Sequence, residues 1–283
     1  LNALFKSAKL RSDVLSVISK PVEFHTPWHH YRQNFLNENR INAGVQFWLE
    51  NEKTLTNISQ VYGVPAQVIV AILGVESFYG KDKGRYRVID TLSTLGFFYP
   101  KRSAFFLTEL ENFLLLCREE KINPLMPLGS YAGAMGAAQF MPSSIRTYAV
   151  DYDKDKHKDM QHNLFDVLAS VANYLAKYGW LRGQTAAYPV QAKGEDYQKA
   201  LLSDGLLPDF TLAQLKALNI TIPAQLDLKL KAKLLRFEQK QGYELWIGLP
   251  NFYVISRYNR SAFYAMAVHQ LSAAILAKKE TVK

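Results

Sequence analysis

The longest apolar stretch of the chain runs from Val64 to Val75 and contains a single polar residue, Gln67. It is too short to span a membrane, which takes about 20 apolar residues in a helix. Pro65 suits the first position of a helix, and the helix predicted from Pro65 to about Phe78 is apolar on nearly every side. We therefore expect this helix to run through the core, with the rest of the chain packed around it.

A core of that kind is within reach of this chain, because 48% of its 283 residues are hydrophobic. The single cysteine excludes an intrachain disulfide framework and a multi-cysteine metal centre. This residue, Cys117, lies on the apolar face of a predicted helix, where we expect it to be a packed small side chain. The chain begins at Leu1 without a charged and apolar leader, so we expect a mature or trimmed form, in which any export signal or lipid anchor would not be visible.

The net charge of +9 suggests an anionic partner, which would be a nucleic acid, a membrane surface or an acidic polymer. The alternative is a soluble basic protein without such a partner. The sequence contains no run of five like charges and no zinc-finger or RNA-recognition signature. Nucleic acid is therefore not favoured.

Helical spacing of apolar residues continues through most of the first 180 residues. Besides the central helix, helices are predicted at 24–50 with an interruption near 37–42, at 51–62, at 103–120 and at 164–178. The pattern changes at 181–196, which contains glycines and a proline and has no helical spacing. Beyond a short helix at 211–218, strands are predicted at 226–230, 233–238, 243–247 and 251–257, followed by a helix at 261–278. This order predicts a mainly α protein (α+β) with a small antiparallel β-containing insertion.

Glu76 is the most unusual residue of the predicted central helix. It follows Ile69, Ile72 and Leu73 at spacings of seven, four and three, which place it on a face of core residues. Burial disfavours the charged form of a carboxyl group and raises its pKa, which makes it a proton donor near neutral pH. The alternative is a structural glutamate paired with a local cation such as Lys81 or Arg102.

A second unusual segment extends from Gly129 to Ser144 and is rich in glycine and alanine. Its composition favours neither a helix nor a strand. Small side chains let a ligand approach the backbone, and Ser130 and Gln139 supply hydrogen-bonding groups. The alternative is a tight helix–helix crossing, which also selects glycine and alanine.

Together these segments resemble the membrane-bound lytic murein transglycosylase B family and its soluble fragment, within the lysozyme-like superfamily. The resemblance covers about residues 27–271. It rests on Glu76–Gly80 and on the motifs at 61–65, 94–102, 129–144, 170–174, 179–180, 251–253 and 257–259. It implies a lysozyme-like catalytic core at 61–182, a small β-containing domain at 183–259, and a helical region formed by 1–60 and 260–283 that packs on the core.

The resemblance implies that the protein cleaves the β-1,4 bond between N-acetylmuramic acid and N-acetylglucosamine in peptidoglycan and leaves 1,6-anhydromuramic acid ends. Glu76 matches the single catalytic acid/base, and the N-acetyl group of the sugar takes the place of the second carboxylate that ordinary glycosidases use. Asp82 and Asp90 are the nearest later carboxylates, but neither lies in a matching motif. No cofactor is required in such a reaction.

The resemblance also implies a set of substrate-binding residues. Ser130 and Gln139 match positions that contact the sugar and its N-acetyl group, and Lys101 and Arg102 match a basic pair for peptide or lactyl carboxylates, although a lysine cannot form a bidentate fork. The remaining positions of the groove are Tyr31, Tyr131, Tyr174, Tyr258, Asn259 and Tyr264. Aromatic rings stack on sugars and amides match their polar groups, whereas the alternative for each tyrosine is ordinary core packing.

Asp151, Asp153 and Asp155 resemble the start of an EF-hand calcium loop at 151–163, a loop that relatives carry at this place. Lys156 stands where glycine is usual at the sixth position, and His162 stands where an acid is usual at the twelfth. Three lysines leave the segment 151–159 with a net charge of −1. The alternative to a calcium site is a surface turn whose charges pair with one another.

The resemblance implies a periplasmic or cell-envelope protein, and any attachment to the outer membrane would be through a lipid-anchored segment not present here. Its expected partners are peptidoglycan strands and other cell-wall enzymes, and no nucleic acid. Two alternatives share the same residues: a hydrolytic muramidase, and a peptidoglycan-binding scaffold without turnover.

Overall fold

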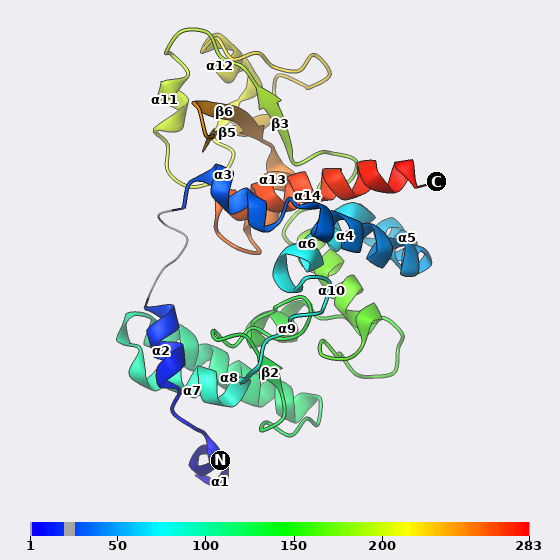
Figure 1. The fold of residues 1–283 in the computed structure, drawn as a ribbon, viewed down its shortest axis with the longest axis vertical. Coiled ribbons are helices and arrows are strands. Elements are labelled where there is room, and N and C mark those ends of the chain that lie inside the picture. The colour runs from blue at the N-terminus through cyan, green and yellow to red at the C-terminus, as the bar shows by residue number, and fades with distance from the viewer. Residues whose placement is uncertain (1, 20–25, 283) are drawn as a thin grey trace. The chain divides into compact units, whose positions relative to one another are not determined.

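The computed structural model describes residues 2–19 and 26–282, so the predicted helix start at Phe24 lies outside the described residues. The described chain is mainly helical with small antiparallel sheets, which confirms the predicted fold class (Figure 1). Its α-helices are α1 (Asn2–Ser7), α2 (Ser12–Ile18), α3 (Trp28–Tyr31), α4 (Glu38–Glu50), α5 (Glu52–Tyr62), α6 (Ala66–Ser77), α7 (Val88–Phe98), α8 (Ser103–Glu119), α9 (Pro142–Tyr148), α10 (Leu164–Lys177), α11 (Gln198–Leu201), α12 (Leu212–Ala217), α13 (Pro250–Ser256) and α14 (Ala262–Thr281). Two 3₁₀ turns, η2 (Arg32–Asn34) and η3 (Pro100–Arg102), follow α3 and α7.

The predicted central helix is α6, which agrees with the prediction to within one residue at each end. Gly63 ends α5 in the left-handed conformation, with φ of 74°, and so lets the chain turn into α6. Ile69, Ile72 and Leu73 are fully buried. Burying each such side chain stabilises the fold by about 1.5–3 kcal/mol, so this helix is a main part of the core.

The chain forms two compact units. Unit 1 comprises residues 1–24, 53–58 and 72–174, and unit 2 comprises 25–52, 59–71 and 175–283. Among the described helices, no single one is long and apolar enough to cross a membrane, and α5 and α6 reach the required length and hydropathy only together, across a bend of 111°.

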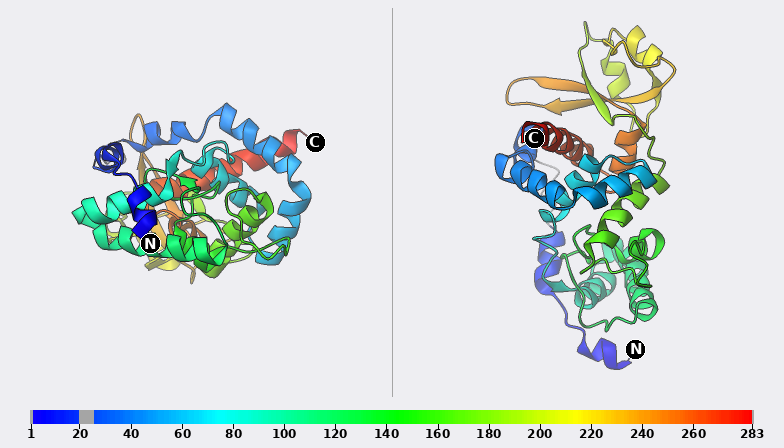
Figure 2. Two further views of the ribbon diagram at one scale, coloured as in Figure 1. Left: turned by 90° about the horizontal axis from the view of Figure 1, so that it is seen from below. Right: turned by 90° about the vertical axis from the view of Figure 1, so that its right-hand side faces the viewer.

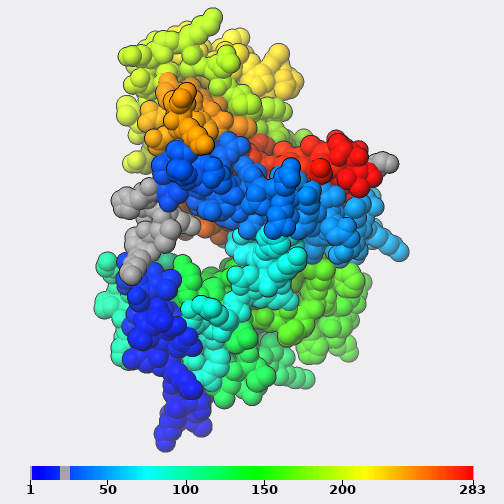
Figure 3. Space-filling view, in the orientation of Figure 1, coloured from blue at the N-terminus to red at the C-terminus, as the bar shows by residue number. Residues whose placement is uncertain are grey.

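In unit 1, α7 and α8 pack along each other, and α9 lies against α8 (Figure 2). Strands β1 (Tyr86–Arg87) and β2 (Leu128–Gly129) form an antiparallel pair in which Tyr86 faces Gly129. The N-terminal helices α1 and α2 lie on the outside of this unit, and α2 contacts α7 (Figure 3). Cys117 on α8 is 2% exposed, which confirms its predicted role as a packed side chain.

In unit 2, α14 packs against α4 and α13. The four-stranded sheet of this unit has the antiparallel order β3-β6-β5-β4, formed by β3 (Ala187–Val190), β4 (Phe210–Thr211), β5 (Lys231–Glu238) and β6 (Tyr243–Gly248). One side of the sheet packs on α11 and α12 through an apolar cluster that includes Leu212, Leu215, Leu234 and Ile247. The sheet falls in the part of the chain for which a small β-containing domain is predicted.

Two of the four predicted strands are confirmed as β5 and β6, and the other two predictions are wrong. The residues predicted as a strand at 251–257 lie mainly in helix α13 (Pro250–Ser256), because Pro250 begins a helix and Phe252 and Ile255, three residues apart, are both buried. Residues 226–230 form turns, in which Leu230 N donates to Asp227 O at 2.9 Å. Strand β3 lies in the segment 181–196, for which no element is predicted.

The interruption predicted near 37–42 lies slightly earlier in the structure. Helix α4 begins after Asn37, whose side chain accepts a hydrogen bond from Arg40 N at 3.0 Å. Such an N-cap satisfies one of the free N–H groups at a helix start, which explains why the helix restarts here.

Candidate active site

Glu76 is the penultimate residue of α6 and is half-buried. The next residue, Ser77, is 2% exposed, and its Oγ donates to Ala137 O at 2.6 Å. This bond joins the end of α6 to the glycine- and alanine-rich segment 129–144, which lies about 60 residues further along the chain. The structure therefore brings the two unusual features of the sequence together.

The backbone directly after Glu76 has a rare conformation. Phe78, Tyr79 and Gly80 all lie in the left-handed region, with φ of 50°, 61° and 85°. This conformation costs a residue with a side chain about 1–2 kcal/mol. Tyr79 N donates to Leu73 O at 3.0 Å, and Gly80 N donates to Ser77 Oγ at 2.9 Å, which hold the turn. Strain of this kind concentrates at functional sites, so its position beside Glu76 supports a function there.

The segment 129–140 folds as two narrow reversals that extend the small sheet of unit 1. Gly129 bridges Met135, and Met135 bridges Phe140. Gly136, with φ of 68°, stands at the tip of the second reversal, where an added Cβ would come within 2.0 Å of Met160 O. Only glycine fits there. Most of this segment is neither helix nor strand, as predicted, while its last residues, from Pro142, begin α9.

The side chain of Ser130 is fixed by its own turn. Its Oγ accepts hydrogen bonds from Ala132 N at 3.2 Å and from Ala134 N at 3.1 Å. A hydroxyl oxygen has two lone pairs, so a group used in this way can offer a further partner only its hydrogen.

The side chain of Gln139 is also fixed by hydrogen bonds, but here the groups in use are donors. Its Nε2 donates to Gly136 O at 2.9 Å and to Lys83 O at 3.3 Å, which uses both amide hydrogens. The remaining group, Oε1, is an acceptor. Gln139 itself has a φ of 50°, a conformation that residues with side chains rarely adopt. Ser130 therefore presents a donor and Gln139 an acceptor.

Four other predicted residues also lie in unit 1. Tyr131 is 42% exposed beside Ser130. Lys101 and Arg102 are exposed on η3, and the guanidinium of Arg102 lies 4.4 Å from the ring centroid of Phe105. Tyr174 on α10 is 6% exposed, and its ring centroid lies 5.4 Å from that of Phe140. Tyr174 thus packs against the residue that follows Gln139.

The last four predicted residues lie in unit 2. The rings of Tyr258 and Tyr264 are stacked, with centroids 6.2 Å apart and an angle of 15° between their planes. Tyr264 is 2% exposed, near the start of α14, and Asn259 is exposed in the turn that precedes this helix. Tyr31 is 8% exposed, and its ring centroid lies 5.5 Å from that of Phe263.

The two neighbouring carboxylates of Glu76 have other partners. Asp90 is 2% exposed and accepts two hydrogen bonds from the Arg87 guanidinium, at 2.8 Å each, and one from Lys9 N at 3.0 Å. It therefore anchors the N-terminal residues to α7. Asp82 is exposed and accepts from Gly84 N at 3.2 Å. Neither arrangement favours a second catalytic carboxylate.

Three residues that hold the candidate site and the acidic loop in shape are missing from the sequence predictions. Ser77 joins α6 to Ala137, and Glu109, buried on α8, accepts hydrogen bonds from Ser143 at the start of α9. Asp166 is fully buried on α10 and accepts from Tyr152 N at 2.8 Å and from Asp159 N at 2.9 Å. Burial raises the pKa of Asp166. A charged residue on the otherwise apolar face of a helix is the only sequence signal that points to Glu109 and Asp166.

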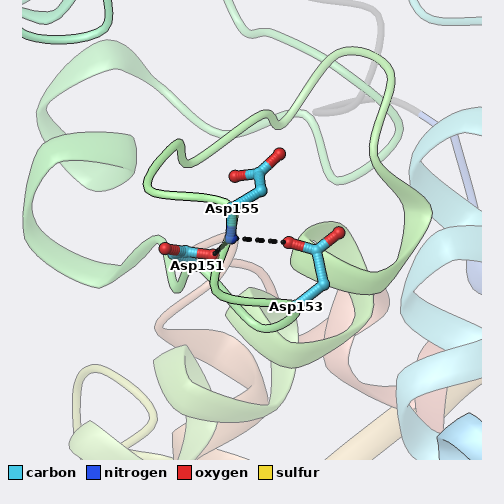
Figure 4. A group of neighbouring side chains, drawn as sticks. All are labelled: Asp151, Asp153 and Asp155. Atoms are coloured by element: carbon cyan, nitrogen blue, oxygen red, sulfur yellow. Dashed lines mark hydrogen bonds between the residues drawn. The ribbon is translucent and has the colours of Figure 1, made fainter.

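The acidic loop brings its three aspartates together (Figure 4). One carboxylate oxygen from each of Asp151, Asp153 and Asp155 lies within 4.8 Å of the others. Asp151 also accepts from Asp155 N at 3.1 Å and from Lys156 N at 2.9 Å. Lys156 has a φ of 76°, the left-handed conformation that favours the glycine usual at this position of an EF-hand. At this one position the backbone therefore has the conformation that the usual glycine adopts, with lysine in its place.

The chain is similar to known proteins over nearly its whole length. The family model described as a transglycosylase SLT domain matches residues 1–273. Membrane-bound lytic murein transglycosylase B of Escherichia coli is 44% identical over 248 residues, which are 88% of this chain and 67% of that protein. Both matches rest on sequence, and each covers far more of the chain than any single motif.

Solved structures agree in fold. Soluble lytic transglycosylase SltB1 of Pseudomonas aeruginosa is 44% identical with a TM-score of 0.93, and the match covers 98% of this chain and 92% of that one. Escherichia coli Slt35, in complex with calcium, is 40% identical with a TM-score of 0.88 over 98% and 87% of the two chains. Pseudomonas aeruginosa SltB3, in complex with NAG-anhNAM-pentapeptide, is 31% identical with a TM-score of 0.86 over 96% and 72%. These matches, together with a half-buried glutamate at the end of a core helix and the segment joined to it, establish that the chain belongs to the lytic murein transglycosylase B family.

Proposed function

We propose that this chain cleaves peptidoglycan as a lytic murein transglycosylase, with Glu76 as its single acid–base group. The observation that carries the proposal is the junction of α6 with the segment 129–140 through Ser77 and Ala137, at 2.6 Å. The residue next to Glu76 is thereby bonded to the segment that carries a fixed donor on Ser130 and a fixed acceptor on Gln139, which supports the proposal.

One carboxyl group is enough for this reaction. As an acid, Glu76 would protonate the glycosidic oxygen, and the bond from that oxygen to C1 of the muramic acid would break while the N-acetyl oxygen bonds to C1. As a base, the resulting carboxylate would take the proton of the C6 hydroxyl, whose oxygen then displaces the N-acetyl oxygen from C1. The proton returns to Glu76, and no water is consumed.

The fixed groups of Ser130 and Gln139 match the sugar's N-acetyl group. The acetamide has one N–H and one carbonyl oxygen, so an acceptor such as Gln139 Oε1 and a donor such as the Ser130 hydroxyl can hold it. Groups that are already fixed by the backbone lose little entropy on binding, which favours a defined position of the reacting N-acetyl oxygen.

The test compares two variants that each remove one carboxylate. Glu76→Gln should abolish release of soluble fragments from purified peptidoglycan, whereas Asp82→Asn should retain it. An acid–base group contributes about 10²–10⁴-fold to a rate, and here one group serves both steps. Release by Glu76→Gln at the rate of the parent would refute the assignment.

The products distinguish the two enzymatic alternatives. Mass spectrometry of the fragments should show muropeptides that are lighter by one water than those with reducing ends. Fragments with only reducing ends would indicate a hydrolytic muramidase. Binding of peptidoglycan without release of fragments would indicate a scaffold.

We also infer that the protein works in the cell envelope, where this substrate lies. One relative is described as membrane-bound, and another is solved in complex with a peptidoglycan fragment that carries a pentapeptide.

The acidic loop is proposed to bind calcium through Asp151, Asp153 and Asp155. Slt35 is solved in complex with calcium, and carboxylate oxygens are the ligands that calcium prefers. The short separation of the three oxygens and the left-handed backbone at Lys156 fit this ion. Calcium would hold the loop by neutralising its carboxylates, and it takes no part in the steps assigned to Glu76.

A further inference from the structure

The amide of Gln139 has two anchors, and one of them lies outside its own segment. Its Nε2 donates to Gly136 O at 2.9 Å within the segment, and to Lys83 O at 3.3 Å across 56 positions of the chain. A carbonyl oxygen can only accept, so the amino end of the amide has to face both carbonyls, and Oε1 takes the opposite side. The bond to Lys83 is the longer of the two, so a small shift of this residue is enough to break it.

The backbone of Lys83 is held by contacts on both sides of this carbonyl. Its side chain is half-buried, and Nζ donates to Gln161 O at 2.8 Å. The next residue, Gly84, has a φ of 88° and lies so close to Ser130 that an added Cβ would come within 2.5 Å of Ser130 N. Of these two contacts, the ammonium is the one that a substitution can remove without changing the backbone.

The carbonyl that receives this ammonium is itself well anchored. Gln161 N donates to Asp159 Oδ1 at 2.9 Å, and Asp159 N donates to Asp166 Oδ2 at 2.9 Å. Asp166 is fully buried on α10. Hydrogen bonds therefore lead without a break from a core helix through Lys83 to the amide of Gln139, and this amide is the group on which the proposed function relies for an acceptor.

We propose that Lys83 is a positioning residue of the candidate active site, which keeps the amide of Gln139 in the orientation that presents Oε1 to the N–H of the sugar's N-acetyl group. This inference rests on the proposed function, because Lys83 acts through Gln139 and does not itself hold the sugar. An acceptor that turns away would let the N-acetyl group take other orientations, and its oxygen would then reach C1 less often.

The kinetic test follows cleavage of soluble glycan strands by two variants of Lys83. Lys83→Met keeps most of the side-chain length and removes the ammonium. We expect its kcat to fall about tenfold while KM stays within about twofold, because the N-acetyl oxygen acts in the reaction step itself. Lys83→Arg keeps a charged donor and should retain at least about half of the parent's kcat.

Lys81→Met is the matched control. Lys81 is exposed in the same loop, and its ammonium lies 5.1 Å from the ring centroid of Phe78 instead of on a carbonyl. This variant loses the same charge at nearly the same place, so its kcat should stay within about twofold of the parent's. A loss equal to that of Lys83→Met would mean that charge near the site matters and the bond to Gln161 does not, which would overturn the inference.

A double-mutant cycle separates positioning from a general loss of stability. Lys83→Met should add nothing to the effect of Gln139→Ala, since the acceptor that Lys83 positions is then already gone. A general destabilisation would add its full effect in both backgrounds. Full additivity, or an unchanged kcat in Lys83→Met, would overturn the inference. Should Lys83→Met fail to fold, Lys83→Gln, whose side chain is one bond shorter, takes its place in the cycle.

A second measurement does not depend on turnover. In NMR spectra, the side-chain N–H signals of Gln139 should shift and exchange faster with water in Lys83→Met, because one of their two acceptors has moved. They should stay in place in Lys81→Met. Gln139 signals that are identical in Lys83→Met and the parent would contradict the inference. Failure of the parent to yield anhydro products would instead refute the proposed function, and the change in the Gln139 signals would remain.

Discussion

The carboxylate of Glu109 accepts two hydrogen bonds from Ser143, one from its backbone N at 2.9 Å and one from its Oγ at 2.6 Å. Glu109 lies on α8 and is 4% exposed, and Ser143 is the second residue of α9. Because α9 begins two residues after Phe140, this pair fixes the end of the segment that carries Gln139. A negative charge also interacts favourably with the N–H groups at a helix start.

Glu109→Ala should therefore reduce both stability and activity. Loss of two hydrogen bonds to a buried charge should lower the free energy of unfolding by about 3 kcal/mol. We expect kcat/KM on peptidoglycan to fall about tenfold as Gln139 loses its fixed position, which corresponds to about 1.4 kcal/mol of transition-state stabilisation. Urea unfolding and the rate of fragment release measure the two effects.

Glu119→Ala is the control for this prediction. Glu119 also joins α8 to α9, through Arg146 at 2.7 and 2.9 Å, but it is 41% exposed and pairs further along α9. Exposed ion pairs contribute about 0–1 kcal/mol, so stability and kcat/KM should change little. A loss of activity equal to that of Glu109→Ala would mean that any link between the two helices matters equally.

The elements set by local pattern could be predicted from the sequence. The central helix could be predicted from its unbroken apolar residues and from Pro65. Strands β5 and β6 could be predicted from alternating apolar residues on either side of a turn. Helix α13 was predicted as a strand, because the six residues from Asn251 are as consistent with alternation as with helical spacing. What selects the helix is tertiary contact: Asn251 is fully buried, and its side chain bonds the backbone of Leu181 and Gln184.

The candidate site was predictable only in part for the same reason. Glu76 could be predicted because a carboxyl group is unusual on an apolar helix face, and Ser130 and Gln139 because they lie in a recognisable motif. The contacts that hold them, Ser77 with Ala137 and Glu109 with Ser143, join residues 60 and 34 positions apart. Serine is common on helices, so no local pattern marks Ser77, and Glu109 is marked only by its place on an otherwise apolar helix face.

Cys117 should be unreactive in the folded protein. Burial raises the pKa of its thiol to about 12, so the reactive thiolate is scarce at pH 8. A thiol reagent should modify the native protein far more slowly than the protein in 6 M guanidinium chloride. Above the unfolded pKa of about 9, unfolding releases a proton, so this residue should make stability fall as the pH rises. Rapid modification of the native protein would show that α8 opens readily.

His269 should make the protein less stable in acid. Burial on α14 lowers the pKa of its imidazole from 6.5 to about 4. Between these values the unfolded chain binds a proton that the folded chain does not bind, so stability is lost as the pH falls. From pH 6.5 to 5.0 the loss should be about 2 kcal/mol.

Urea unfolding of His269→Gln should therefore show a smaller loss between these two pH values than the parent. The exposed His30 gives the control, and His30→Gln should retain the full loss. Equal pH dependence in all three proteins would show that the buried imidazole is not the cause.

Calcium should stabilise the protein through the acidic loop. A ligand that binds only the folded state at 100 times its Kd adds about 2.7 kcal/mol, so millimolar calcium should raise Tm by several degrees. Asp153→Asn should remove this shift, because it deletes one of the three clustered carboxylates. Lys156→Gly should increase it, since glycine adopts the φ of 76° without strain and the change also removes a positive charge. Magnesium, which requires a tighter octahedral site, should have little effect. Asp204→Asn is the control, because Asp204 is exposed and lies outside the loop. If calcium raised the Tm of Asp153→Asn as much as that of Asp204→Asn, the ion would bind elsewhere.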